Sequence, residues 1–153
     1  IKSNIKFGKP HATHDEVEHS AKIAQAYDFI TNKEKGFDEP ISEGGSNVSG
    51  GQKQRLSIAR ALVRKPEIYI FDDSFSALDF KTDAILRKAL KKETTDAIVL
   101  IVAQRIGSIM DADKIIVLDE GKVVGVGKHK ELLKTCNVYH EIALSQLTEE
   151  ELA

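Results

Sequence analysis

Hydrophobic and polar positions divide the chain into two parts with different periodicity. Over residues 1–65 the apolar positions recur at helical spacing, beginning with the capping-box pattern Thr13–Glu16. Over residues 66–153 short apolar runs appear instead, in EIYIFDD, AIVLIVA and KIIVLDE, without the alternation of a half-exposed strand. The pattern therefore predicts a helical subdomain over 1–65 and a parallel-sheet α/β portion over 66–153.

The stretch between the first two runs has the period of a helix. Residues 79–92 carry four apolar positions on one helical stripe: Ile85, Leu86, Ala89 and Leu90. The order of run, helix and run predicts a βαβ unit. Further along, DEG predicts a hairpin turn, two short helices are expected around 128–134 and 138–147, and the final TEEELA is expected to be a frayed acidic tail.

Glycine is concentrated just before the change of pattern. Residues 33–51 hold five of the ten glycines and Pro40, which indicates a long ordered loop. The loop leads into SNVSGGQKQRLSIARAL, where Ser49 is a suitable N-cap and a helix with core-facing apolar positions is expected to start at Gln52. A helix start with two glycines exposes backbone N–H groups that can bind phosphate. Taken alone, however, this sequence favours an ordinary glycine turn before a helix.

Composition excludes several functions. The chain is 41% hydrophobic and 30% charged, as expected for a folded globular domain. Its net charge of -2 gives no electrostatic case for nucleic acid, so no nucleic-acid partner is expected. The single cysteine suits a reducing compartment, and the five histidines show no metal-ligand spacing with it. The apolar runs are far shorter than the roughly 20 residues of a membrane-spanning helix.

Asp72 changes the interpretation of the glycine helix. It ends the run IYIF, where a carboxylate at the end of a parallel strand lies beside Mg²⁺ and phosphate in P-loop enzymes. The ordered set SGGQKQR, LVRKPEIYIFDDSFSALD and IVLIVAQR resembles the nucleotide-binding domain of ATP-binding cassette (ABC) transporters. The resemblance extends over nearly the whole chain and is closest to exporter-type members. It implies a P-loop NTPase fold with ATP and Mg²⁺ as ligands.

The resemblance also implies roles for individual residues. Four of them match the signature motif, which contacts the γ-phosphate of ATP held by the opposite subunit of a head-to-tail dimer: Ser49, Gly50, Gly51 and Gln52. Val48 stands where leucine is usual. The remaining matches are Asp72 as the Walker B aspartate that holds Mg²⁺ through water, Ser76–Asp79 as the D-loop at the dimer interface, and Glu43 as the exporter X-loop position near the membrane helices.

Two positions depart from the family pattern. Asp73 stands where a glutamate usually polarises the attacking water, and Gln104 stands where a histidine usually contacts the γ-phosphate. Aspartate is one methylene shorter, and a displacement of about 1 Å can cost about a hundredfold in rate. Glutamine cannot become cationic. Both changes resemble the degenerate subunit of heterodimeric ABC exporters, in which one composite site hydrolyses ATP slowly and the other turns over.

The phosphate-binding pattern G-x-x-x-x-G-K-[ST] does not occur in the sequence. We therefore expect the chain to be the carboxyl-terminal part of a nucleotide-binding domain, with a phosphate-binding loop and a transmembrane domain upstream, at the cytoplasmic face of a membrane. By itself it is expected to bind ATP weakly and to hydrolyse none. The alternatives are a non-hydrolytic ATP-dependent dimerisation or regulatory module and a non-membrane ABC ATPase. The transported substrate is not encoded in these residues.

Overall fold

The structure is a computed structural model that describes residues 1–148. The acidic residues of the expected tail follow Thr148 and lie outside the described residues. The chain consists of two compact units, one spanning Ile1–Val102 and the other beginning at Ala103. The mixed α/β fold class expected from the sequence is confirmed.

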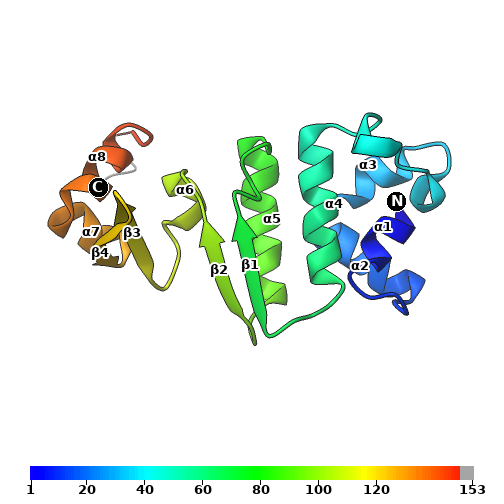
Figure 1. Cartoon of the computed structure of the whole chain (residues 1–153), viewed down its shortest axis with the longest axis horizontal. Helices are drawn as coiled ribbons and strands as arrows, with labels where there is room; N and C mark the ends of the chain where they lie inside the picture. The colour runs from blue at the N-terminus through cyan, green and yellow to red at the C-terminus, as the bar shows by residue number, and fades with distance from the viewer. Residues whose placement is uncertain (149–153) are drawn as a thin grey trace. The chain divides into compact units, whose positions relative to one another are not determined.

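The first unit combines a group of helices with a βαβ segment (Figure 1). Its elements are α1 (Lys2–Lys6), α2 (His14–Ile23), α3 (Tyr27–Thr31), the 3₁₀ turns η1 (Gly36–Asp38) and η2 (Glu43–Gly45), α4 (Gly50–Leu62), β1 (Ile68–Asp72), α5 (Phe80–Glu93) and β2 (Ile98–Val102). The strands β1 and β2 pair in parallel, with Ile68 opposite Ile98 and Asp72 opposite Val102. The predicted βαβ unit is therefore confirmed.

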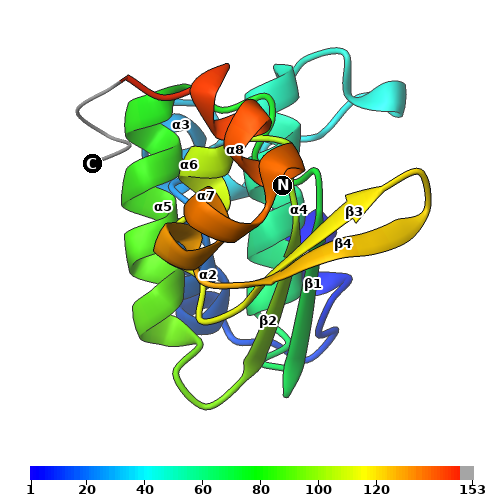
Figure 2. The same ribbon diagram turned by 90° about the vertical axis from the view of Figure 1, so that its left-hand side faces the viewer.

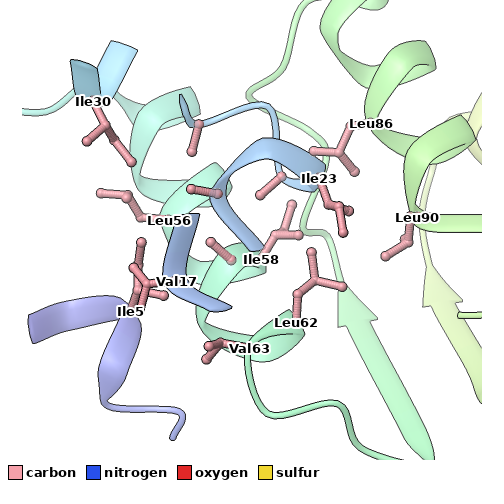
Figure 3. Packing of buried hydrophobic residues seen from close by; sticks show 14 of the residues in the cluster. Ile5, Val17, Ile23, Ile30, Leu56, Ile58, Leu62, Val63, Leu86 and Leu90 are labelled. Carbon is pink, nitrogen blue, oxygen red and sulfur yellow. The ribbon is translucent and has the colours of Figure 1, made fainter. Parts of the chain in front are cut away.

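Helix α4 lies at the centre of the helical group and contacts both α1 and α2. Its residues Leu56, Ile58 and Leu62 are buried, and they share one hydrophobic core with Ile5 and Val17 (Figure 3). This burial removes the apolar stripe of α4 from water and is the main force that holds the short helices around it, because helices of five residues are unstable alone.

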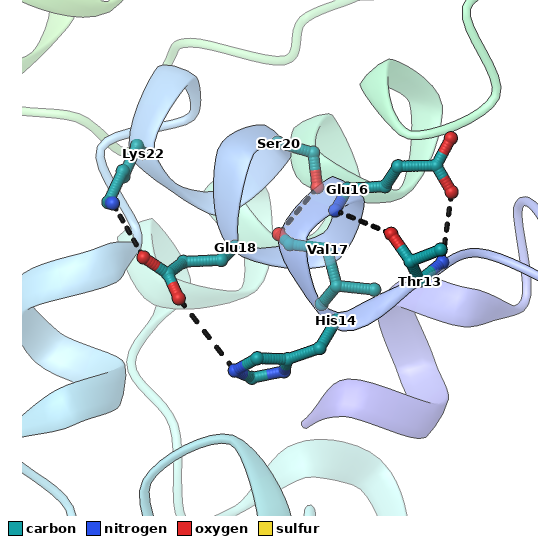
Figure 4. Close-up of polar contacts among 7 residues, drawn as sticks. All are labelled: Thr13, His14, Glu16, Val17, Glu18, Ser20 and Lys22. Carbon is teal, nitrogen blue, oxygen red and sulfur yellow. Dashed lines mark hydrogen bonds and ion pairs between the residues drawn. The ribbon is translucent and has the colours of Figure 1, made fainter.

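Helix α2 begins with the capping box that the sequence predicts (Figure 4). The Glu16 amide donates to Thr13 Oγ1 at 3.2 Å, and the Thr13 amide donates to Glu16 Oε2 at 2.9 Å. On the exposed side, Glu18 accepts from Lys22 Nζ at 2.5 Å and lies 3.7 Å from His14 Nε2. Surface pairs of this kind contribute little, so the cap and the buried face define the helix.

The β1–β2 pair is covered on one face. Tyr69 and Phe71 are buried in the same core as Leu86 and Leu90 of α5, whereas five apolar side chains of the other face are exposed: Ile68, Ile70, Ile98, Leu100 and Val102. The expectation that these strands are covered on both faces is wrong for the described residues, because no element described in this unit packs on the second face.

The apolar stripe predicted for α5 needs one correction. Leu86 and Leu90 are buried and Ala89 packs partly against the core, but Ile85 is 46% exposed. Neighbouring helical residues project about 100° apart, so the turn that directs Leu86 toward the core directs Ile85 away from it.

The second unit is a hairpin covered by short helices, and Figure 2 shows α7 and α8 on one side of that hairpin. Its elements are α6 (Ile106–Ile109), β3 (Ile115–Asp119), β4 (Lys122–Gly127), α7 (His129–Thr135) and α8 (Asn137–Leu144). The predicted turn is confirmed: Glu120 and Gly121 both have positive φ, at 44° and 75°, as two-residue hairpin turns require. Within residues 1–148 no helix is long and apolar enough to span a bilayer.

Replacing Leu86 should destabilise the first unit far more than replacing its neighbour Ile85. Leu86→Ala removes a fully buried side chain and should lower the free energy of unfolding by about 2–5 kcal/mol. Ile85→Ala, at a half-exposed position, should cost less than about 1 kcal/mol. Urea unfolding followed by circular dichroism measures both, and similar losses for the two variants would contradict the described packing of α5.

Candidate functional site

The start of α4 is a capped helix N-terminus. Ser49 Oγ accepts from the Gln52 amide at 3.2 Å, and the Ser49 amide donates to Gln52 Oε1 at 3.0 Å. The prediction that Ser49 caps this helix is confirmed, although the helix begins at Gly50 rather than at Gln52. This capping box uses the amide of Gln52. The amides of Gly50 and Gly51 have no partner within the helix by its geometry, so they can donate to an external acceptor.

The two glycines differ in the space around them. A Cβ added at Gly51 would lie 2.9 Å from the carbonyl oxygen of Ala77, in the loop after β1. A Cβ added at Gly50 would only meet the Ala77 methyl at 3.7 Å, an ordinary contact. Glycine at 51 is therefore required by the close approach of this chain's own loop, a reason that the sequence did not reveal.

Asp72 and Asp73 stand at the carboxyl end of β1, and both are exposed. The Asp73 amide donates to the carbonyl of Val102 at 3.0 Å, which continues the pairing with β2 by one residue. Asp73 has a φ of 47°, in the left-handed region. Aspartate enters this region more readily than most residues, because its short side chain bonds locally.

Gln54 joins α4 to the loop that follows these carboxylates. Its Nε2 donates to the Asp73 carbonyl at 3.1 Å and to Ser76 Oγ at 3.0 Å, and its Oε1 accepts from the Ala77 amide at 3.0 Å. The sequence analysis missed this residue. In the sequence, Gln54 is marked only by its position one helical turn after Gly50 and Gly51. That position indicates a contact with the loop only when the loop is known to lie against α4.

Arg55 anchors the same turn of α4 to the corner between α2 and α3. Its Nη1 donates to the Gln25 carbonyl at 2.7 Å, and its guanidinium lies 4.8 Å from the ring centre of Phe29. Burial lowers the pKa of Arg55, while the charges of Asp79 and Asp28 act in the opposite direction. Arginine nevertheless stays cationic, so a positive charge is fixed near the start of α4.

Asp79 caps helix α5. Its carboxylate accepts from the Thr82 amide at 2.9 Å and from Thr82 Oγ1 at 2.7 Å. These hydrogen bonds, that of the Thr82 amide first, lower the pKa of Asp79 and keep it ionised at neutral pH. Within this chain Asp79 therefore fixes the direction in which α5 leaves the loop after β1.

The loop before α4 is ordered, as predicted. Asn47 organises it, since its Nδ2 donates to the Pro40 carbonyl at 2.8 Å and its Oδ1 accepts from the Ser42 amide at 3.1 Å. Glu43 is exposed in η2, and Val48 is buried.

Gln104 belongs to the second unit. Its carbonyl accepts from Gln146 Nε2 at 2.9 Å, and Gln146 Oε1 accepts from the Ile106 amide at 2.9 Å. Gln146, which the sequence analysis did not single out, thus fixes the segment around Gln104 on α6. The residues expected at the site fall into two groups: the start of α4 lies against the loop after β1 in the first unit, and Gln104 is held in the second.

Comparison with known proteins agrees with this geometry. The ABC transporter family profile matches residues 3–76. Two Staphylococcus aureus proteins, of strains NCTC 8325 and COL, named as multidrug export ATP-binding/permease proteins, are 44% identical over 142 residues, which is 93% of this chain and 25% of theirs. A bacterial Atm1-family ABC exporter structure with ATP bound matches 97% of this chain and 26% of that chain, with a TM-score of 0.92 and 36% identity.

The chain therefore matches the ABC transporter family over part of its length and is a portion of an ABC nucleotide-binding domain. More particularly, it is homologous to multidrug exporters and to the Atm1-family exporter, and it spans about a quarter of the length of these relatives. The sequence-based resemblance to the family is confirmed.

Adding a methyl group should be tolerated at Gly50 but not at Gly51. Gly51→Ala forces the Ala77 carbonyl to move and should lower the free energy of unfolding by about 1–3 kcal/mol. Gly50→Ala meets no backbone atom and should be neutral or slightly stabilising, because alanine favours helix. Denaturant unfolding compares the two variants, and equal stability would contradict the close approach of the loop to α4.

Proposed function

We propose that this chain is part of the ATP-binding and ATP-hydrolysing domain of an exporter, in which the start of α4 contacts ATP held by a second ABC subunit. The observation that carries the proposal is the capped, glycine-containing start of α4, held against the loop that follows Asp72 and Asp73. A transmembrane domain of the same polypeptide would couple this site to transport, at the cytoplasmic face of the membrane.

The start of α4 has the groups needed for a γ-phosphate. The amides of Gly50 and Gly51 and the positive end of the helix dipole favour an anion. The Ser49 hydroxyl uses a lone pair to accept from the Gln52 amide, so its proton can be donated to a phosphate oxygen. Gln52 completes the cap and keeps these donors oriented.

The end of β1 fits a hydrated Mg²⁺. Asp72 presents an exposed carboxylate at the carboxyl end of a parallel strand, and Mg²⁺ retains several waters when it is bound by one or two carboxylates and phosphate. Asp72 would hold the ion through water, and the ion would neutralise phosphate charge. Asp79, in the D-loop, would reach the dimer interface while it caps α5.

The chain's own hydrolytic site is proposed to be slow. Asp73 would hold its carboxylate short of the position from which a glutamate polarises water. Gln104 would donate one hydrogen bond to phosphate without adding positive charge. The start of α4 would then serve the partner's site, which turns over. The same two residues also favour a second candidate, a module that clamps on ATP without hydrolysing it.

A negative charge at Gly50 should block the proposed phosphate contact without disturbing the fold. Gly50→Asp, made in the full-length protein assembled with its partner, should lower ATPase activity by about a hundredfold or more, since a negative charge at the helix start would repel the γ-phosphate. The isosteric control Gly50→Asn should retain much more activity. Aspartate in a first helical turn is stabilising, so folding is preserved. Equal activity in the two variants would leave α4 as a structural helix only.

Restoring the two departures should raise turnover at the chain's own site. The assay uses an assembly whose partner carries glutamine in place of its catalytic glutamate, so that the remaining activity comes from this site. Asp73→Glu should increase ATP hydrolysis. The double variant Asp73→Glu with Gln104→His should increase it by more than the sum of the two single effects, since both residues act on one transition state. Asp73→Asn is the control. If nucleotide binds but turnover does not rise, Asp73 and Gln104 are not the cause of the slow hydrolysis.

A further inference from the structure

Gln54 uses both ends of its side-chain amide on one loop. The amide nitrogen donates to the Asp73 carbonyl and to Ser76 Oγ, and the amide oxygen accepts from the Ala77 amide. Helix α4 is thereby joined to the main chain of the loop at its first residue, Asp73, and again at Ala77. A bridge of this kind transmits displacement in either direction. When the helix moves, the loop must move with it or a hydrogen bond is broken, and the same holds when the loop moves.

The loop that Gln54 holds has a left-handed backbone conformation at Asp73. Aspartate enters this region more readily than most residues, and hydrogen bonds on both sides of Asp73 hold it there. The Asp73 amide donates to the Val102 carbonyl at 3.0 Å. The Asp73 carbonyl accepts two hydrogen bonds, one from Gln54 Nε2 and one from Ser76 Oγ, each at 3.1 Å. Since the peptide planes on both sides are held, the direction of the Cα–Cβ bond of Asp73 is set as well.

We propose that Gln54 is a positioning residue that couples the start of α4 to the carboxylate of Asp73. The inference rests on the proposed function, in which α4 contacts ATP in one composite site and Asp73 belongs to the other. A phosphate that draws the start of α4 toward itself moves Gln54, and Gln54 carries that displacement into the Asp73 main chain. The two nucleotide sites are thus linked through one side chain.

The test uses the full-length protein assembled with its partner and three variants. Gln54→Ala removes all three hydrogen bonds. Gln54→Glu is isosteric and retains an oxygen for the Ala77 amide but loses the donors to Asp73 and Ser76. The matched control is Lys53→Ala, which alters the adjacent residue, whose Nζ donates to the Gly44 carbonyl at 2.9 Å and not to the loop after β1.

The first measurement is amide hydrogen exchange without nucleotide. The Ala77 amide should exchange about tenfold faster in Gln54→Ala, the effect of losing one hydrogen bond, and at the wild-type rate in Gln54→Glu and Lys53→Ala. An unchanged Ala77 rate in Gln54→Ala would overturn the inference, whatever the outcome with ATP.

The second measurement is ATP hydrolysis in the assembly whose partner carries glutamine in place of its catalytic glutamate, so that the remaining turnover comes from the site of Asp73. Both Gln54 variants should lower kcat by about tenfold while KM for ATP changes by less than about twofold, because orientation is lost and ground-state binding is kept. Lys53→Ala should keep the wild-type kcat. If both Gln54 variants keep the wild-type kcat, Gln54 has a structural role only, and the proposal is overturned. If the wild-type assembly hydrolyses no ATP, the proposed function fails instead, and the exchange of Ala77 still decides whether the bridge exists.

Discussion

The contact between the start of α4 and the loop after β1 determines the rest of the candidate site. The Ala77 carbonyl approaches Gly51 so closely that a side chain cannot be placed there, and the Gln54 side chain closes the same contact from one turn further along. Because of this contact, the donors at the helix start and the carboxylates at the strand end form one rigid arrangement. Helix caps and strand pairing explain each part separately, and this contact joins the two parts.

Two further anchors fix that arrangement within the first unit. Arg55 ties the first turns of α4 to the Gln25 carbonyl, and the buried stripe of α4 holds the helix among α1 and α2. At the other side, Asp79 caps α5, and Leu86 of α5 shares one hydrophobic core with the buried residues of β1. The loop after β1 is therefore held at both ends and along its length, as expected for a segment that positions charged groups.

Much of this fold follows from local patterns in the sequence. The capping box at Thr13, the N-cap at Ser49, the helical period around Leu86 and the turn at Gly121 each depend on residues close together in the chain, and each was predicted correctly. The burial of Ile85 was predicted wrongly, because periodicity defines a stripe but not its exact direction toward a strand.

The missing parts of the site depend on contacts between distant residues. Gln54 meets a loop about twenty residues away in sequence, and Gln146 meets the segment of Gln104 about forty residues away. Neither glutamine lies in a motif that carries its role. The resemblance to a family located the candidate phosphate and magnesium groups, whereas the side chains that hold them in place became visible only in the structure.

The central claim is that the start of α4 faces the γ-phosphate of ATP bound by the partner subunit. It is tested most directly by photo-crosslinking in the full-length assembly, with an ATP analogue that carries a reactive group on its γ-phosphate. With the phosphate-binding loop that is proposed to lie upstream in the full-length polypeptide inactivated, label is expected on residues 49–52 of this chain, and that label should be lost when the partner's phosphate-binding loop is inactivated as well. Label elsewhere in the chain, or label on 49–52 that persists without the partner's loop, would contradict it.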